Sequence, residues 1–242
     1  MIRSFVKRRL SRGLRAALRQ VADEWRSQRI HRASARRAAE LTTAGPVRLN
    51  LGCGDKKKPG WVNVDLYAPE ADLRLDLREP LPFPDGSIIH IYCEHFFEHL
   101  EYPDVDDAMA TVLETPERSS EALGFLRECR RVLAPGGVLD ILVPDAERKI
   151  GMYVKRREDA FPVGRDWWGP AWCDTPMHCI NYLFRQGREH KYAYDEETLT
   201  RAFETAGFVD VRRRPYDPSL DAPSHELGSL CLVGRKPGAA SG

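Results

Sequence analysis

Glycines that could let a ligand approach the backbone follow the first predicted strand. Gly52 and Gly54 come directly after the apolar run 47–51, and glycines two positions apart allow a sharp turn with no Cβ in the way. A dinucleotide-binding loop would carry a third glycine three positions later, where Lys57 stands instead. The loop therefore predicts a ligand at this strand end, but not NAD bound in the usual way.

Two aspartates occupy comparable positions at the next strand ends. Asp65 ends the run 61–66, where its carboxylate could accept hydrogen bonds from both ribose hydroxyls. Asp76 lies near the end of the run 73–77 beside apolar Leu77, a combination that suits an adenine. Either aspartate alone could equally cap a helix or a turn. Their joint placement after consecutive strands favours a nucleoside.

These residues depend on an alternation of strands and helices along the chain. Helical patterns at 121–133, 145–159 and 196–206 separate several of the strand-like runs, which are 47–51, 61–66, 73–77, 88–93, 138–143, 208–213 and 230–234. This order predicts an α/β fold with a largely parallel sheet and helices on both faces. In such a sheet the ligand crevice lies at the carboxyl ends of the strands.

Several longer segments together resemble one enzyme family. They are LNLGCG at 49–54, PGWVNVD at 59–65, PLPFPD at 80–85, EHFFEHL at 94–100, ECRRVLAPGG at 128–137, VPD at 143–145 and the stretch 198–208. In combination they are similar to class I S-adenosylmethionine-dependent methyltransferases, and in particular to their small type 11 group. The resemblance covers about residues 47–236. Each motif alone would be weak evidence for the family.

The resemblance implies a Rossmann-like, doubly wound sheet of seven mostly parallel strands, with the last strand antiparallel. It implies S-adenosyl-L-methionine as the cofactor and S-adenosyl-L-homocysteine as the product. The residues that would contact the cofactor are Asn50, Gly52, Cys53, Gly54, Asp65, Leu66, Asp76, Leu77, Glu94 and His95. Only six residues separate Gly54 from Trp61, too few for the family's usual first helix, which predicts a more open crevice on that side.

Methyl transfer to a hydroxyl requires a base at or near the step, and histidine has a suitable pKa. The candidates are His95, directly after the fourth predicted strand, and His178 and His190, which bracket an aromatic insertion at 161–194. We expect His99, with Glu98, to be structural. The rings of the insertion either line an acceptor site or fill a small core of their own.

The N-terminal segment differs from the rest in charge. Residues 1–40 hold twelve Lys or Arg and three acidic residues, whereas the rest of the chain holds 25 basic and 33 acidic residues. Apolar residues at three- and four-residue steps predict a basic amphipathic helix there. It could lie on an anionic membrane surface, or pack against the body or a partner protein. The acidic body makes nucleic acid an unfavoured partner.

The chain has no apolar run near the roughly 18 to 20 residues that span a bilayer, and no apolar core of a secretory signal. We therefore expect a cytoplasmic protein, peripheral at the membrane if the arm binds there. The six cysteines are dispersed along the chain without close pairing, which predicts reduced thiols and not a disulfide framework. Cys173, His178, Cys179 and His190 lack a CxxC pair, so no metal site is predicted.

The predicted function is methylation of a hydroxyl on a small molecule, a glycan or a natural product, of the kind made in polysaccharide and natural-product pathways. Two alternatives remain. One is a catalytically inactive methyltransferase-like protein that binds a cofactor or a partner. The other is an RNA methyltransferase that uses the basic arm to hold phosphates. A homo-oligomer is compatible with each.

Overall fold

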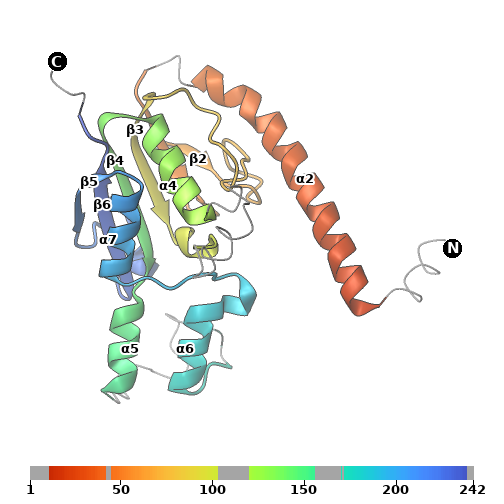
Figure 1. The fold of residues 1–242 in the computed structure, drawn as a ribbon, viewed down its shortest axis with the longest axis vertical. Coiled ribbons are helices and arrows are strands. Elements are labelled where there is room, and N and C mark those ends of the chain that lie inside the picture. The colour runs from red at the N-terminus through yellow and green to blue at the C-terminus, as the bar shows by residue number, and fades with distance from the viewer. Residues whose placement is uncertain (1–10, 42–44, 103–119, 156–169, 171, 239–242) are drawn as a thin grey trace, which may run out of the picture.

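The computed structural model describes residues 11–41, 45–102, 120–155, 170 and 172–238. Its centre is a single sheet of strands with helices around it (Figure 1). The strands are β1 (Val47–Leu51), β2 (Val62–Val64), β3 (Ile88–Glu94), β4 (Leu133–Pro144), β5 (Val209–Arg213) and β6 (Ser229–Arg235). The core is formed by the buried faces of these strands and the helices packed on them.

The strand order is β2-β1-β3-β4-β6-β5, in which β1, β2, β3 and β4 are parallel and β6 runs antiparallel to both of its neighbours. The register aligns the strand ends, because Leu51 pairs with Val64 and with Cys93, and Glu94 pairs with Leu142. The residues that follow β1, β2 and β3 therefore meet at one edge of the sheet. The antiparallel last strand is confirmed.

The sheet among the described residues has six strands, and of the seven predicted strands the run 73–77 does not form one. Residues 73–77 contribute only an isolated bridge between Val64 and Leu73. The next amides that could join a ladder are bonded to side chains of a helix: Arg74 N–H donates to Ser34 Oγ and Asp76 N–H to His31 Nδ1, both at 3.1 Å. Helix side chains thus cover an edge that would otherwise be unpaired.

That helix is α2 (Arg12–Leu41), which runs along the β2 side of the sheet in Figure 1. Its Ala38 and Ser27 are buried, and its Glu24 forms an ion pair with Arg78. The helix predicted for the basic segment is therefore present from Arg12, and one of its faces packs against the body. Residues 1–10 lie outside the described residues. None of the helices described is long and apolar enough to cross a membrane.

The remaining helices are α4 (Glu121–Val132) and α7 (Glu196–Thr205), side by side on one face of the sheet, and α5 (Ala146–Val154) and α6 (Pro176–Arg185) beyond the strand ends (Figure 1). Each begins at a residue whose side chain accepts a backbone N–H: Ser120, Asp195, Asp145 and Thr175. Three of them confirm predicted helices. Helix α6 lies within the aromatic insertion at 161–194, where no helix was predicted.

Short 3-10 turns complete the fold at Phe97–His99, Gln186–Arg188 and Pro223–His225. Between Gly54 and Trp61 the chain forms turns without a helix, as the short spacing predicts. The space beside this loop is taken by the segment before β6, since Lys58 Nζ donates to the carbonyl oxygen of Leu220.

Candidate active site

A cleft of about 950 Å³ lies between the strand ends and the inner face of α2. Its walls include most of the predicted cofactor residues: Gly52, Gly54, Asp65, Leu66, Asp76, Leu77 and His95. Helix α2 contributes the opposite wall through Ala16, Arg19, Gln20, Asp23, Glu24 and Ser27. The volume lies in the range of sites that enclose small molecules.

The two loop glycines have different surroundings. Both have positive φ, +66° at Gly52 and +50° at Gly54, which L side chains rarely adopt. A Cβ on Gly52 would lie 2.5 Å from Phe96 Cβ, so this glycine is required by packing. A Cβ on Gly54 would meet nothing within 4 Å, so this backbone faces open space. Gly54 is thus the position where a ligand can approach the chain.

Asp65 fixes the shape of this loop. Its Oδ2 accepts Gly54 N–H at 3.0 Å, and its Oδ1 accepts Tyr67 and Ala68 N–H at 2.8 Å each. A carboxylate offers about four acceptor positions. Three backbone amides therefore leave Oδ2 able to accept one more donor, such as a ribose hydroxyl.

Asp76 is already engaged by a cation. Arg78 donates to Asp76 Oδ1 at 3.0 Å and to Oδ2 at 2.6 Å, and also reaches Glu24 of α2 at 3.0 Å. Burial raises the pKa of Asp76, but the hydrogen bonds and charge of Arg78 outweigh it and hold the pKa low. The carboxylate predicted to meet an adenine is ionised and bound to Arg78 in this state.

A second, smaller cavity of about 280 Å³ shares Gly52, Gly54, His95 and His99 with the cleft. Its other lining residues are largely ionisable or polar and include Asn50, Lys56, Glu94, Glu98, His190 and His225. Four histidines and two glutamates therefore surround a space next to the predicted cofactor position.

Glu94 and His225 form a hydrogen-bonded pair in this cavity. Glu94 Oε1 accepts Ala222 N–H and His225 Nδ1–H, both at 2.9 Å. Burial raises the pKa of Glu94, yet these bonds lower it to about 2. Burial also lowers the pKa of His225, against the opposing effect of Glu94, so His225 is neutral at pH 7. Its proton lies on Nδ1, and Nε2 accepts from Lys56 Nζ at 3.2 Å.

His95 lies between this pair and the rest of the cluster. Its ring stacks on that of His225 with centroids 3.8 Å apart. Its Nε2 is 2.8 Å from Ser229 Oγ and its Nδ1 is 3.4 Å from Glu98 Oε1. The residue has a φ of +51°, a strained value for a side chain of this size. With both ring nitrogens turned to protein groups, His95 is suited to position His225.

Glu98 and His190 form the deepest part of the cavity. Glu98 is 1% exposed, and His190 Nε2 lies 3.9 Å from its Oε1. His190 Nδ1 is 2.6 Å from the carbonyl oxygen of Leu183, to which it must donate. The ring of His99, expected to be structural, meets that of His190 edge to face with centroids 4.9 Å apart. His99 therefore belongs to the cavity.

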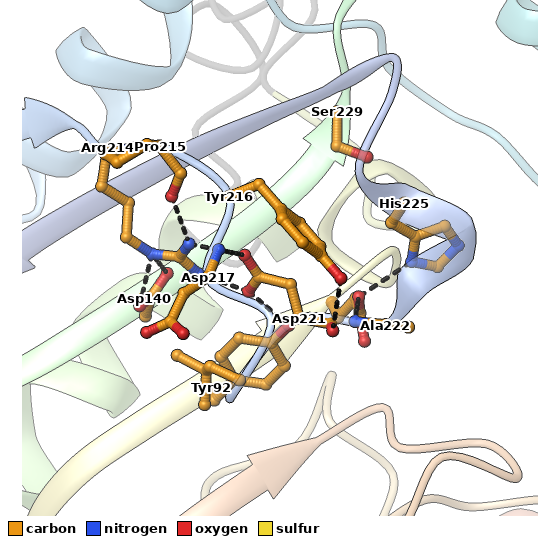
Figure 2. A network of polar contacts seen from close by, with 12 residues as sticks. Tyr92, Asp140, Arg214, Pro215, Tyr216, Asp217, Asp221, Ala222, His225 and Ser229 are labelled. Atoms are coloured by element: carbon orange, nitrogen blue, oxygen red, sulfur yellow. Dashed lines mark hydrogen bonds and ion pairs between the residues drawn. The ribbon is translucent and has the colours of Figure 1, made fainter.

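A buried charge network holds the segment that carries His225 (Figure 2). Arg214 donates to both oxygens of Asp140 at 2.9 and 3.0 Å, and to both oxygens of Asp221 at 2.6 and 2.7 Å. Asp221 also accepts Tyr92 O–H at 3.0 Å and Asp217 N–H at 2.8 Å. The network ties the loop before β6 to strands β3 and β4, and so places His225 beside Glu94.

The other predicted site residues lie apart from this chemistry. His178 is on exposed α6, paired with Asp174 at 2.7 Å, and lines neither cavity. Tyr192 and Tyr194 of the insertion pack on Tyr102, so these two rings fill a core. Trp167 and Trp168, two further rings of the insertion, lie outside the described residues.

Asn50 and Cys53 line the smaller cavity without a free donor to offer. Both amide protons of Asn50 are used, toward Lys56 O and Asn63 Oδ1 at 2.9 Å. Burial raises the pKa of Cys53 to about 11, so its thiol stays protonated, and the thiol donates to the carbonyl oxygen of Gly54 at 3.5 Å. All six cysteines are free in the structure.

The main residue that sequence reasoning missed is His225. It precedes the last strand in the segment Ala222–Pro223–Ser224–His225, which has no helical or strand periodicity. A signal was nevertheless available, because a histidine beside the end of an antiparallel strand lies near the carboxyl ends of its parallel neighbours.

Comparison with known proteins finds a family model that matches part of the chain. Residues 56–141 match the family model described as a methyltransferase domain, which leaves α2 and everything after Ile141 outside the match. No curated protein matches the chain.

Solved structures with similar folds are distant in sequence. An S-adenosylmethionine-dependent methyltransferase from Archaeoglobus fulgidus is 17% identical, with 88% of this chain and 94% of that chain covered and a TM-score of 0.44. A Haloferax volcanii methyltransferase in complex with the Trm112 activator is 18% identical, with 89% and 96% covered and a TM-score of 0.44. Phosphoethanolamine N-methyltransferase 2 from Haemonchus contortus, in complex with S-adenosyl-L-methionine, is 13% identical, with 80% and 49% covered and a TM-score of 0.44.

Proposed function

We propose that this chain, which is a class I S-adenosylmethionine-dependent methyltransferase, methylates a hydroxyl group of a small molecule, glycan or natural product. The observation that carries the choice of a hydroxyl is the Glu94–His225 pair, whose Nδ1–O distance is 2.9 Å, in a cavity next to the cofactor cleft. A hydroxyl must lose its proton at or near methyl transfer, and this pair can accept one.

The residues around the cleft fit the cofactor. Gly54 leaves open space at the backbone, Asp65 retains an acceptor position, and the cleft of about 950 Å³ continues past Leu75 and Leu77, which offer apolar surface for a base. When bound, S-adenosylmethionine supplies an electrophilic methyl group. The protein's contribution is to hold the acceptor in line and to keep water away.

His225 would take the proton from the acceptor hydroxyl. Glu94 holds its tautomer by accepting the Nδ1 proton, which leaves the lone pair of Nε2 for the acceptor. As Nε2 gains the proton, the ionised Glu94 stabilises the imidazolium that forms. Lys56, 3.2 Å from Nε2, is exposed and can turn toward the acceptor oxygen as its negative charge develops. His95 and His190, proposed from the sequence, would shape the acceptor cavity.

Calorimetry with S-adenosylmethionine and S-adenosylhomocysteine tests cofactor binding, and we expect both to bind the folded chain. A screen of hydroxylated acceptors, followed by mass spectrometry for the gain of one methyl group, tests the reaction. Binding of neither ligand to a folded sample would contradict the proposal. Binding of both with no acceptor methylated, together with unchanged binding in Glu94→Gln, would favour a cofactor-binding protein without catalysis.

A second proposal concerns the outer face of α2, whose Leu14, Leu18, Val21 and Trp25 are 48–67% exposed. They follow one another at three- and four-residue steps, and Arg29 lies over the Trp25 ring at 5.1 Å. An apolar stripe beside arginines is complementary to the surface of an anionic bilayer. We propose that this face attaches the enzyme peripherally to such a surface while the inner face closes the cleft.

A further inference from the structure

The deepest part of the smaller cavity contains a carboxylate without a hydrogen-bond donor. Glu98 is 1% exposed, and neither of its carboxylate oxygens has a hydrogen-bond partner among the described residues. The nearest cationic candidate is His95, whose Nδ1 lies 3.4 Å from Oε1. An ionised carboxylate in such a position needs a compensating positive charge.

His190 does not supply that charge as a hydrogen-bond donor. Its Nδ1 proton is committed to the carbonyl oxygen of Leu183 at 2.6 Å, so in the neutral ring Nε2 carries a lone pair. That lone pair faces Glu98 Oε1 at 3.9 Å. Two acceptors thus face one another across a gap that a cation would occupy. Metal-binding histidines commonly donate their second ring proton to a backbone carbonyl in this way.

A third donor completes the arrangement. Glu98, His99 and His190 each offer one ligand atom, and these atoms all lie within 4.8 Å of one another. Lys191 and Tyr192 N–H donate to the carbonyl oxygen of Glu98 at 2.8 and 3.2 Å, which fixes the chain carrying His190 against the turn carrying Glu98 and His99. Small side-chain rotations would bring the donors to the roughly 2.0–2.2 Å that zinc requires.

We propose that Glu98, His99 and His190 bind a divalent first-row transition metal ion, with Zn²⁺ as the ion that best suits the ligands. Two imidazoles and one carboxylate are a ligand set of catalytic zinc sites, in which a further position is open to water or substrate. Here the open position would face the cavity that also holds His225.

The role of the ion rests on the proposed function, although its binding does not. A hydroxyl coordinated to the ion would have a lowered pKa, and its proton would pass to His225 Nε2. The oxygen then attacks the methyl carbon, whose bond to sulfur breaks as the new C–O bond forms. The ion itself undergoes no redox change.

Metal titration of the full chain tests the site. The protein is freed of metal with a chelator and titrated with Co²⁺, followed by its visible absorption, and with Zn²⁺, followed by calorimetry. We expect one ion per chain, and Glu98→Gln and His190→Gln should each weaken binding at least about tenfold. The control is His178→Gln, which removes an exposed histidine near Cys173 and Cys179 and should leave binding unchanged.

Circular dichroism and affinity for S-adenosylhomocysteine check that the variants fold. If Glu98→Gln does not fold, the metal affinity of His190→Gln tests the proposal. No saturable binding to the wild-type chain would overturn the proposal. So would a thiolate-to-cobalt charge-transfer band, or binding lost in His178→Gln and kept in Glu98→Gln, because the ion would then lie at the cysteines. Each of these outcomes leaves S-adenosylmethionine binding and acceptor methylation to be measured separately.

Discussion

Arg214 and Asp221 are joined by two hydrogen bonds of 2.6 and 2.7 Å, and the side chain of Asp221 is fully buried (Figure 2). Asp140 shares the same guanidinium, so a single arginine bridges two buried carboxylates, one from β4 and one from the loop before β6. This pairing keeps His225 next to Glu94, although the two residues are more than a hundred positions apart in the sequence.

Replacing Arg214 by Met should therefore destabilise the fold strongly. Both carboxylates would be left buried without a cation, for which a loss of about 3–5 kcal/mol in the free energy of unfolding is typical. The matched control is Arg212→Met on the same stretch of chain, where the side chain is exposed and should be nearly neutral. Urea unfolding of both variants measures the difference. Equal midpoints would show that the network contributes little.

Gly54 and Gly60 permit a paired test of the cofactor cleft. Both have positive φ, +50° and +77°, and a Cβ at either meets nothing within 4 Å, so alanine should cost each about 1 kcal/mol of stability through the backbone. Only Gly54 lines the cleft. Calorimetry with S-adenosylhomocysteine should show at least about tenfold weaker binding for Gly54→Ala and little change for Gly60→Ala. Similar affinities in the two variants would place the ligand elsewhere.

The local features of this site could be predicted from the sequence, because they lie where strands end. Gly52, Gly54, Asp65, Glu94 and His95 each follow an apolar run that forms a strand, and the parallel register brings them together. The features that were missed depend on contacts between distant segments that carry no periodic pattern. His225 reaches Glu94 through a loop held by the buried ion pairs of Arg214. In the segment expected to form the third strand, the Arg74 and Asp76 amides donate to α2 side chains and not to a neighbouring strand.

The contact between α2 and the edge of the sheet can be tested at one backbone amide, that of Arg74. In Ser34→Ala the Arg74 N–H loses its acceptor at 3.1 Å, which should cost about 1 kcal/mol locally. Hydrogen exchange at that amide should then become about fivefold faster. The reverse change at an exposed position of the same helix, Ala33→Ser, is the control and should leave exchange unchanged. Unaltered exchange in Ser34→Ala would mean that the amide is protected by another group.

The Glu94–His225 pair gives activity a predictable pH dependence. Because His225 must be neutral to accept a proton, and burial lowers its pKa, activity should rise with pH, with its midpoint below the usual 6.5, and be level at neutral pH. Glu94 raises the pKa of His225, so in Glu94→Gln that midpoint should move lower, and the rate should fall by about 10²–10⁴. NMR titration of the His225 ring measures the pKa independently of the acceptor. If Glu94→Gln left the pKa of His225 unchanged, the two residues would not act as a pair.

The stripe on α2 can be tested with vesicles. Leu18 is 52% exposed on the outer face, so Leu18→Asp should leave the fold intact while it removes apolar contact with a bilayer and adds an unfavourable charge. Ala17→Asp, next to it and also exposed, adds the same charge without loss of a large apolar side chain. In sedimentation with phosphatidylglycerol-containing vesicles, we expect Leu18→Asp to reduce binding more than Ala17→Asp does. Vesicles of phosphatidylcholine alone should bind the wild-type chain weakly, since they offer the arginines no counter-charge. Binding equal for both vesicle types, or equal in both variants, would remove the membrane as the partner of this face.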